Sequence, residues 1–173
     1  YGTPTAVDEA GTRTIIHVTG KNETSVEVAL NIVVTEGEGK QTGQEGRLLV
    51  DDVNKEICLF GTSAVIETEE NQTAIYLDEN ADGTADYEAP AYTGDLTDYT
   101  IYGVKNTTVS KRVRITMNGG TVGTIYGAYN GNIPVLGNGL ELIFNGGSVG
   151  TIYGLSSSSV SDTFKIEIGA GVT

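Results

Sequence analysis

The chain has 173 residues, which is enough to bury a sizeable core in one domain or in one domain with a small satellite. Its 23 acidic residues outnumber its 10 basic ones, and the resulting net charge of −13 disfavours nucleic acid and anionic lipid as partners. The 24 glycines, 3 prolines and absence of Trp, with many Thr, Val, Ile and Tyr residues, indicate an all-β protein. No apolar run approaches the length that a membrane-spanning helix needs.

The N-terminal part of the chain contains short segments in which apolar and polar residues alternate, a pattern typical of strands. Such segments occupy residues 15–18, 26–34, 48–50, 57–60, 65–66 and 73–77. Their spacing is too uneven for regular coils. We therefore expect an N-terminal β cap or irregular first coils over residues 1–72, with a separate small β-domain as the alternative, followed by a repeat domain over residues 73–173.

Two residues of this part carry reactive side chains, and both patterns favour a structural role. His17 alternates with Ile16 and Val18, which predicts an outward, solvated position in a strand. Cys58 lies within an apolar run and is expected to pack as a small hydrophobe.

An acidic segment follows the last of these strands and has the spacing of a calcium loop, D-x-N-x-D-G-x-x-D. This spacing predicts a structural Ca²⁺ site formed by Asp78, Asn80, Asp82, the Thr84 carbonyl and Asp86. The departure from the pattern is Ala89, which stands where a bidentate carboxylate is expected. An Asx-rich turn without metal is the alternative.

The C-terminal half contains an internal repeat. Ile-Tyr-Gly occurs at residues 101–103, 125–127 and 152–154, and the segments 118–127 and 145–154 differ only at Thr121/Ser148. An alternating strand precedes each corner, with apolar residues at 113, 115 and 117, at 140, 142 and 144, and at 164, 166 and 168. Stacking such copies in register would bury the apolar face of each copy against its neighbours.

This repeat predicts a parallel β-helix, or β-solenoid, with an antiparallel β-sandwich as the alternative. The outward positions Arg114, Glu141 and Lys165 would then lie side by side, about 4.8 Å apart, with alternating charge. The Asn-Gly-Gly corners predict positive φ angles at glycine and a ladder of asparagine side chains. The chain lacks an initial Met and ends at Thr173, where another copy would begin, so we expect a segment of a longer protein.

Residues 99–173 resemble the glycine-rich repeat regions of bacterial secreted and adhesin-like surface proteins, in which G-G-T-V-G-x-I-Y-G segments recur. The resemblance implies a parallel β-helix and an extracellular or cell-surface location. Repeats of this kind specify architecture more than activity.

The tyrosines of the repeat form the best candidate binding surface. With Ile101, Ile125 and Ile152 facing inward, an outward stripe is expected, comprising Tyr102, Tyr126 and Tyr153 and widened by Tyr99 and Tyr129. Such a stripe stacks on sugars, or it stabilises the fold without a ligand.

The leading functional hypothesis is a non-catalytic, adhesin-like module, secreted or on the cell surface, that presents a rigid β-helical face to a glycan or a host or matrix protein. A carbohydrate-binding module is the first alternative. The second is a calcium-dependent polysaccharide lyase or hydrolase, for which the clustered bases are Lys111, Arg112 and Arg114. The sequence assigns no catalytic residue and leaves the oligomeric state open.

Overall fold

The computed structural model describes residues 14–19, 25–30, 40–41, 48–129 and 135–173, with side chains described in 48–129 and 137–173. The chain divides into two units, residues 1–37 and 38–173, and each is considered by itself. The first unit contains an antiparallel pair, β1 (Thr14–Thr19) and β2 (Ser25–Leu30), in which His17 lies opposite Glu27. The predicted orientation of the His17 side chain lies outside the described side chains.

The second unit is built from strands, which confirms the all-β prediction over the residues that the structure describes. The strands are β3 (Lys40–Gln41), β4 (Leu49–Asp51), β5 (Glu56–Cys58), β6 (Ser63–Glu69), β7 (Gln72–Asp78), β8 (Tyr92–Gly94), β9 (Leu96–Lys105), β10 (Val113–Met117), β11 (Thr121–Tyr129), β12 (Val135–Leu136), β13 (Leu140–Ser156), β14 (Ser159–Val160) and β15 (Phe164–Val172). Within the described part of the chain, no helix has the length and apolar character that spanning a membrane requires.

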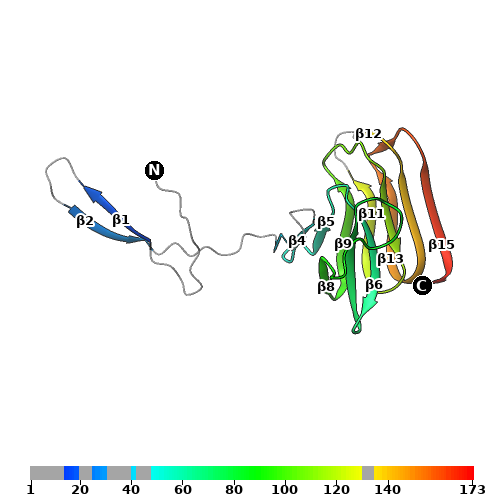
Figure 1. Cartoon of the computed structure of the whole chain (residues 1–173), viewed down its shortest axis with the longest axis horizontal. Helices are drawn as coiled ribbons and strands as arrows, with labels where there is room; N and C mark the ends of the chain where they lie inside the picture. Colours follow the sequence, from blue (N-terminus) through cyan, green and yellow to red (C-terminus); the bar gives the residue numbers. More distant parts are fainter. Residues whose placement is uncertain (1–13, 20–24, 31–39, 42–47, 130–134) are drawn as a thin grey trace. The chain divides into compact units, whose positions relative to one another are not determined.

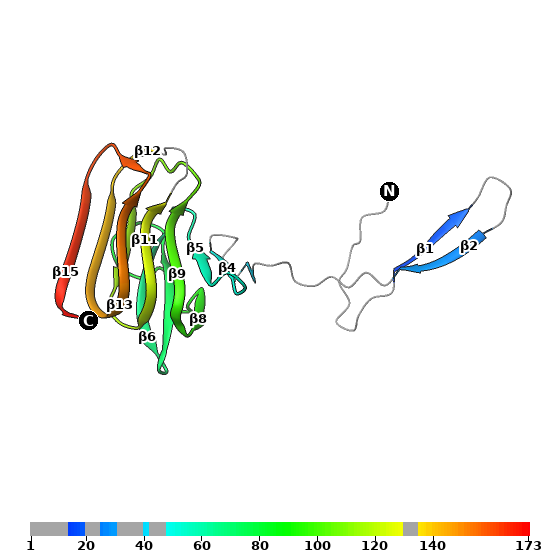
Figure 2. The ribbon, with the colours of Figure 1, turned by 180° about the vertical axis from the view of Figure 1, so that it is seen from behind.

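The main sheet is mixed and curls around strand β13. Its order is β3-β4-β5-β9-β11-β13-β10-β6-β7-β8, and β15 also pairs with β13, while β12 and β14 form a separate pair. The first part of β13 pairs with β10 and β15, and its second part pairs with β11. Because one strand serves both parts, the sheet folds back over itself, as Figures 1 and 2 show from opposite sides.

The repeated segments pair in parallel and in register, as the repeat predicted, and not antiparallel as the sandwich alternative required. In β10, β13 and β15, Val113 lies beside Leu140 and Leu140 beside Phe164. Met117, Phe144 and Ile168 are aligned in the same way. In β9, β11 and β13, Ile101, Ile125 and Ile152 form the corresponding row.

Residues of the segment expected to form a cap, irregular first coils or a small β-domain also contribute to this parallel arrangement. Strand β5 pairs in parallel with β9, with Ile57 beside Ile101, and β6 pairs in parallel with β10, with Ile66 beside Met117. Strands β4, β7 and β8 join antiparallel to their neighbours. The sheet is therefore parallel at its centre and antiparallel at its two ends.

The core lies between the two parts of the curled sheet. Its fully buried members include Ile101, Ile115, Ile125 and Leu142. The third repeat differs, because Phe164, Ile166 and Ile168 are 45%, 41% and 61% exposed although they keep the expected register. Strand β15 has a neighbour on one side only among the described strands, so one flank of its apolar side chains is left exposed.

The close approach of neighbouring strands explains why the third residue of Ile-Tyr-Gly is glycine. A Cβ atom on Gly127 would lie 2.6 Å from the Gly154 carbonyl oxygen and 2.7 Å from a methyl carbon of Leu140. The corners require glycine for another reason, since Gly120 and Gly147 have φ angles of +84° and +94°. The predicted asparagine ladder is present, with Asn145 Nδ2 donating to Asn118 Oδ1 at 2.9 Å.

Candidate functional site

The predicted tyrosine stripe exists as a stack of three rings on the outer side of β9, β11 and β13. The Tyr102 and Tyr126 rings lie 5.2 Å apart at an interplanar angle of 14°, and those of Tyr126 and Tyr153 lie 4.4 Å apart at 12°. Tyr129 packs edge-on, with its centroid 5.7 Å from that of Tyr102 and 5.4 Å from that of Tyr126. The in-register pairing of the strands places the three rings one above another. We call these four residues the tyrosine stack.

Tyr99 does not belong to this stack. Its ring lies 6.4 Å from that of Tyr92, and its hydroxyl donates a hydrogen bond of 2.6 Å to Asp52. This hydrogen bond raises the pKa of Tyr99, and burial contributes further. The sequence suggested that Tyr99 widens the stripe, but its side chain is buried at 6% exposure and fixes a different corner of the sheet.

One end of the tyrosine stack is closed by an ion pair. Lys105 Nζ lies 4.4 Å from the Tyr102 ring centroid and forms a salt bridge with Glu56, which also accepts a hydrogen bond of 3.3 Å from the Tyr102 hydroxyl. Burial, followed by the negative charge of Glu56, raises the pKa of Tyr102 to about 12. The opposite end is open, because Tyr153 is 45% exposed.

The stacking limits what the tyrosines offer to a ligand. Rings whose centroids are 4.4 Å and 5.2 Å apart cover each other's faces and leave no room for a sugar ring between them. Tyr102 is buried and Tyr126 is half-buried, so the ring that presents most of its surface is Tyr153. Tyr129, packed edge-on, is 36% exposed, so sugar stacking is restricted to the outward surfaces of Tyr153 and Tyr129.

The acidic loop after β7 is organised by hydrogen bonds from its own backbone. Asp78 is fully buried, and its two carboxylate oxygens accept hydrogen bonds from the backbone N–H groups of Asp82, at 3.1 Å, and Gly83, at 2.8 Å. Thr84 donates to Asp82 from its hydroxyl and its backbone N–H, and these bonds lower the pKa of the Asp82 carboxyl. Asp86 accepts from the Glu79 N–H at 2.5 Å.

These contacts match the Asx-rich turn that was the alternative to a metal site. Asn80 Oδ1 accepts from the Asp82 N–H at 2.9 Å, a hydrogen bond that closes an Asx turn. Among the described residues, no three Asp, Glu, His or Cys side chains converge as ligands around one point. Two of the predicted calcium ligands, Asn80 and the Thr84 carbonyl, are of other kinds, and the calcium site stays a prediction.

The basic residues near this loop are held in ion pairs. Arg114 lies 2.5 Å from Glu141, as the alternating outward charges predicted, and Arg112 lies 3.5 Å from the same carboxylate. Arg112 also donates a hydrogen bond of 2.6 Å to the Ala81 carbonyl. Lys165 continues this row in register beside Glu141, as predicted, and its ammonium group forms an ion pair with Glu167 of its own strand at 2.6 Å.

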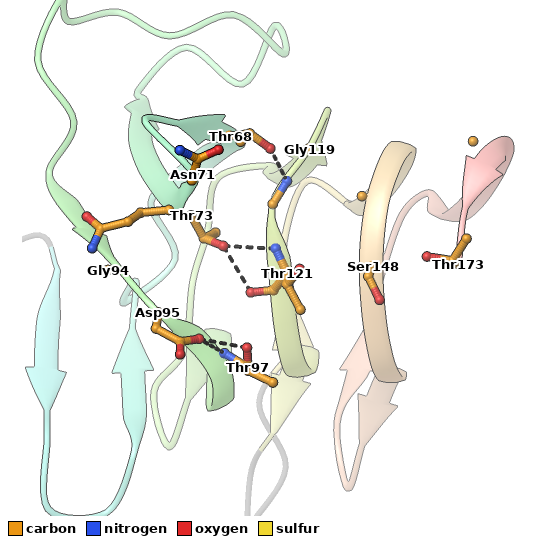
Figure 3. Close-up of a pocket in the computed structure, with 14 residues that line it drawn as sticks. Thr68, Asn71, Thr73, Gly94, Asp95, Thr97, Gly119, Thr121, Ser148 and Thr173 are labelled. Carbon is orange, nitrogen blue, oxygen red and sulfur yellow. Dashed lines mark hydrogen bonds between the residues drawn. The ribbon is translucent and has the colours of Figure 1, made fainter.

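A groove along the glycine corners was not predicted from the sequence. It has a volume of roughly 660 Å³, and successive repeats line it with Thr121, Ser148 and Thr173 (Figure 3). The opposite wall comes from the β6–β7 turn and the start of β9, with Thr68, Asn71, Gln72, Thr73, Asp95 and Thr97. The repeated Asn-Gly-Gly-Thr/Ser corner could have indicated the first wall of this groove. The β6–β7 hairpin, which contributes to the second wall, lies outside the repeat and could not be placed from it.

Hydrogen bonds fix the two walls of this corner groove. Thr73 Oγ1 donates to the Thr121 carbonyl at 3.0 Å and accepts from the Thr121 N–H at 2.8 Å. Asp95 accepts from the backbone and the hydroxyl of Thr97 at 3.0 Å and 2.6 Å (Figure 3). The lining is therefore composed of hydroxyl, amide and glycine surface with a single carboxylate, Asp95.

Comparison of the chain with protein-family models, with curated proteins and with solved structures gives no match.

Proposed function

We propose that this chain is a non-catalytic β-solenoid module of a secreted or cell-surface protein, and that it presents the outer face of β9, β11 and β13 to a glycan or protein partner. The observation that carries the proposal is the parallel, in-register pairing of three Thr-Ile-Tyr segments. Thr100, Thr124 and Thr151 form one row, and the tyrosine stack forms the next. A face with the same side chains at each coil suits a partner that is itself repetitive or extended.

The contacts around this face support a display role, because they make it rigid. The tyrosine rings stack on one another, the asparagine ladder holds the corner, and the salt bridge between Glu56 and Lys105 closes one end. A surface whose side chains are already ordered loses less conformational entropy on binding. The resemblance of the repeat to bacterial surface proteins supports the proposed extracellular location.

The test is binding of the whole chain to arrays of glycans and of extracellular-matrix proteins, with variants of the exposed end of the face. Thr151→Lys and Tyr153→Ser should each weaken a binding signal by about tenfold, which corresponds to ~1.4 kcal/mol. Glu88→Ala, at an exposed position in the acidic loop, is the matched control and should bind as the wild type does. Binding that both face variants leave unchanged would exclude this face.

A carbohydrate-binding module is the second candidate, and the corner groove favours it. Its hydroxyl and amide lining offers hydrogen-bond donors and acceptors of the kind that sugars require. Thr121→Val removes one hydroxyl while keeping the backbone bonds to Thr73. Loss of glycan binding in Thr121→Val but not in Tyr153→Ser would assign the ligand to the groove and not to the outer face.

A further inference from the structure

The carboxylate of the corner groove, Asp95, stands at one end of a row of hydroxyl groups. Thr121 in β11 lies beside Ser148 in β13. Leu96 in β9 lies beside Val122, so Asp95, which precedes Leu96, continues this row (Figure 3). Neighbouring strands are about 4.8 Å apart, so a ligand that crosses the strands meets the carboxylate and the two hydroxyls in turn. Strand β11 lies between β9 and β13, and the row is therefore part of the interior of the sheet.

Asp95 is held in place and still offers one oxygen to a ligand. Its Oδ1 accepts hydrogen bonds from the backbone N–H and the hydroxyl of Thr97, at 3.0 Å and 2.6 Å, whereas Oδ2 has no donor among the described residues. The Thr97 hydroxyl, followed by its N–H, lowers the pKa of Asp95, so the carboxyl is ionised at neutral pH. An exposed, oriented carboxylate oxygen accepts strong hydrogen bonds from hydroxyl donors.

The other groups of the row are suited to the same kind of ligand. The hydroxyls of Thr121 and Ser148 have no hydrogen-bond partner among the described residues, and a hydroxyl can donate as well as accept. They can therefore bond neighbouring hydroxyls of one extended molecule.

The charge of the groove disfavours an anionic ligand. Among the described residues that line it, none is basic. Lys55, whose charge contributes to the lowered pKa of Asp95, lies 4.9 Å from the Tyr99 ring centroid and 3.4 Å from the Tyr99 hydroxyl. A carboxylate or sulfate group in the groove would thus meet Asp95 without a lining cation to offset the repulsion.

We propose that the corner groove binds an uncharged, hydroxyl-rich glycan and that Asp95 determines this specificity. Its Oδ2 accepts a hydrogen bond from a sugar hydroxyl, Thr121 and Ser148 bond the hydroxyls that follow, and glycans with uronic acid or sulfate groups are rejected. This inference rests on the second candidate function, in which the corner groove is the glycan site.

Asp95→Asn tests the proposal with little change in shape. The amide oxygen of the variant can keep both hydrogen bonds from Thr97, while an N–H donor replaces the free carboxylate oxygen. Asp98→Asn is the matched control, because it removes the same charge at an exposed position outside the groove lining. Circular dichroism and melting curves show whether both variants fold as the wild type does.

The whole chain is applied to an array of neutral oligosaccharides of glucose, mannose, xylose and galactose, and of uronic-acid and sulfated oligosaccharides with the same linkages. The wild type and Asp98→Asn should bind neutral glycans alone. Asp95→Asn should bind the preferred neutral glycan about tenfold more weakly, because a charge-assisted hydrogen bond is lost, and should gain binding of its uronic-acid counterpart. Calorimetry with that pair of oligosaccharides measures both changes.

Two results would overturn this specificity while leaving the groove as a glycan site. One is binding of acidic glycans by the wild type, and the other is an affinity for glycans that Asp95→Asn and Asp98→Asn change equally. If the wild type binds no glycan on the array, the carbohydrate-binding function itself is wrong, and this inference fails with it.

Discussion

Single residues of the repeat are determined by how closely the copies approach one another. In Ile-Tyr-Gly, the isoleucine fills the core, the tyrosine stacks on the next tyrosine, and the glycine leaves room for a neighbouring carbonyl. At Gly127 this space is bounded by the Gly154 carbonyl on one side and by Leu140 on the other. The glycine is thus a packing requirement of the stack.

Replacement of Gly127 by Ala should therefore destabilise the protein. The added methyl would meet the Gly154 carbonyl at 2.6 Å, and such overpacking costs about 1–3 kcal/mol. Thermal and urea unfolding measure the change. Glu88→Ala, which adds no atom to the core, is the control, and a Gly127→Ala protein as stable as this control would contradict the packing argument.

The acidic loop carries the second prediction at this scale, which is weak calcium binding. The missing carboxylate at Ala89 predicts a dissociation constant of about 10⁻⁴–10⁻³ M. Millimolar calcium should raise the melting temperature of the wild type and leave that of Asp78→Ala/Asp82→Ala unchanged. If calorimetry detects no heat and the melting temperature does not shift, the loop is an Asx turn without calcium. Magnesium is the control ion.

Sequence reasoning at the residue scale succeeded where repetition supplied a second copy for comparison. The rows from Val113 to Phe164 and from Met117 to Ile168 follow directly from aligning the repeats. It failed where a residue has no counterpart in the repeat. Tyr99 turns to Asp52, a partner 47 positions away that no periodicity indicates.

At the scale of elements, the long strand β13 holds the fold together. Its first part is sandwiched between β10 and β15 and its second part pairs with β11, with the corner at Gly146–Gly147 between them. A destabilising substitution of a buried side chain in β13 should therefore weaken both parts of the sheet.

Leu142→Asp should accordingly abolish cooperative folding of the second unit. Leu142 is fully buried, so the loss of its burial costs about 1.5–3 kcal/mol. An unpaired carboxylate in the core adds several kcal/mol, which together is comparable to the roughly 5–15 kcal/mol that stabilises a domain. Circular dichroism during heating checks this. Leu142→Met should retain a cooperative transition, and an unaltered melt in Leu142→Asp would mean that the strand is not buried as described.

The sequence left open whether the N-terminal part contains irregular first coils, and it did not show which strands, β5 and β6, extend the parallel arrangement. Ile57 occupies the row of Ile101, but the tyrosine position after it is Cys58, so the Ile-Tyr-Gly pattern is lost. The hairpin of β7 and β8, with its acidic loop, then separates these strands from the first recognisable repeat. Such an insertion breaks the regular spacing of the repeat in the sequence, although the strands on either side of it still pair in parallel.

For the whole molecule, the tyrosines set a limit on stability at alkaline pH. The pKa values of Tyr92 and Tyr102 are raised to about 12, chiefly by burial, and that of Tyr126 is raised by the same cause. A folded-state pKa above the unfolded value of about 10 means that the fold favours the neutral phenol. The associated stability is complete below a pH of about 10 and is lost as the pH rises toward about 12.

Melting temperatures measured across this pH range, together with the absorbance of tyrosinate, check the expectation. Tyr102→Phe should weaken the alkaline loss, because it removes one of the titrating groups without removing the ring. Ionisation of all tyrosines near a pH of about 10 while the protein stays folded would contradict the raised pKa values.

The register of the repeats has a consequence for how the protein tolerates changes in length. Tyr102 precedes Val113 by 11 positions and Tyr153 precedes Phe164 by 11, but Tyr126 precedes Leu140 by 14. The three additional residues fall between β11 and β13, and the pairings on either side of them remain aligned. Connections on this side of the molecule are thus free to lengthen, so new peptide segments can be inserted there while a one-residue insertion within a strand would reverse its faces.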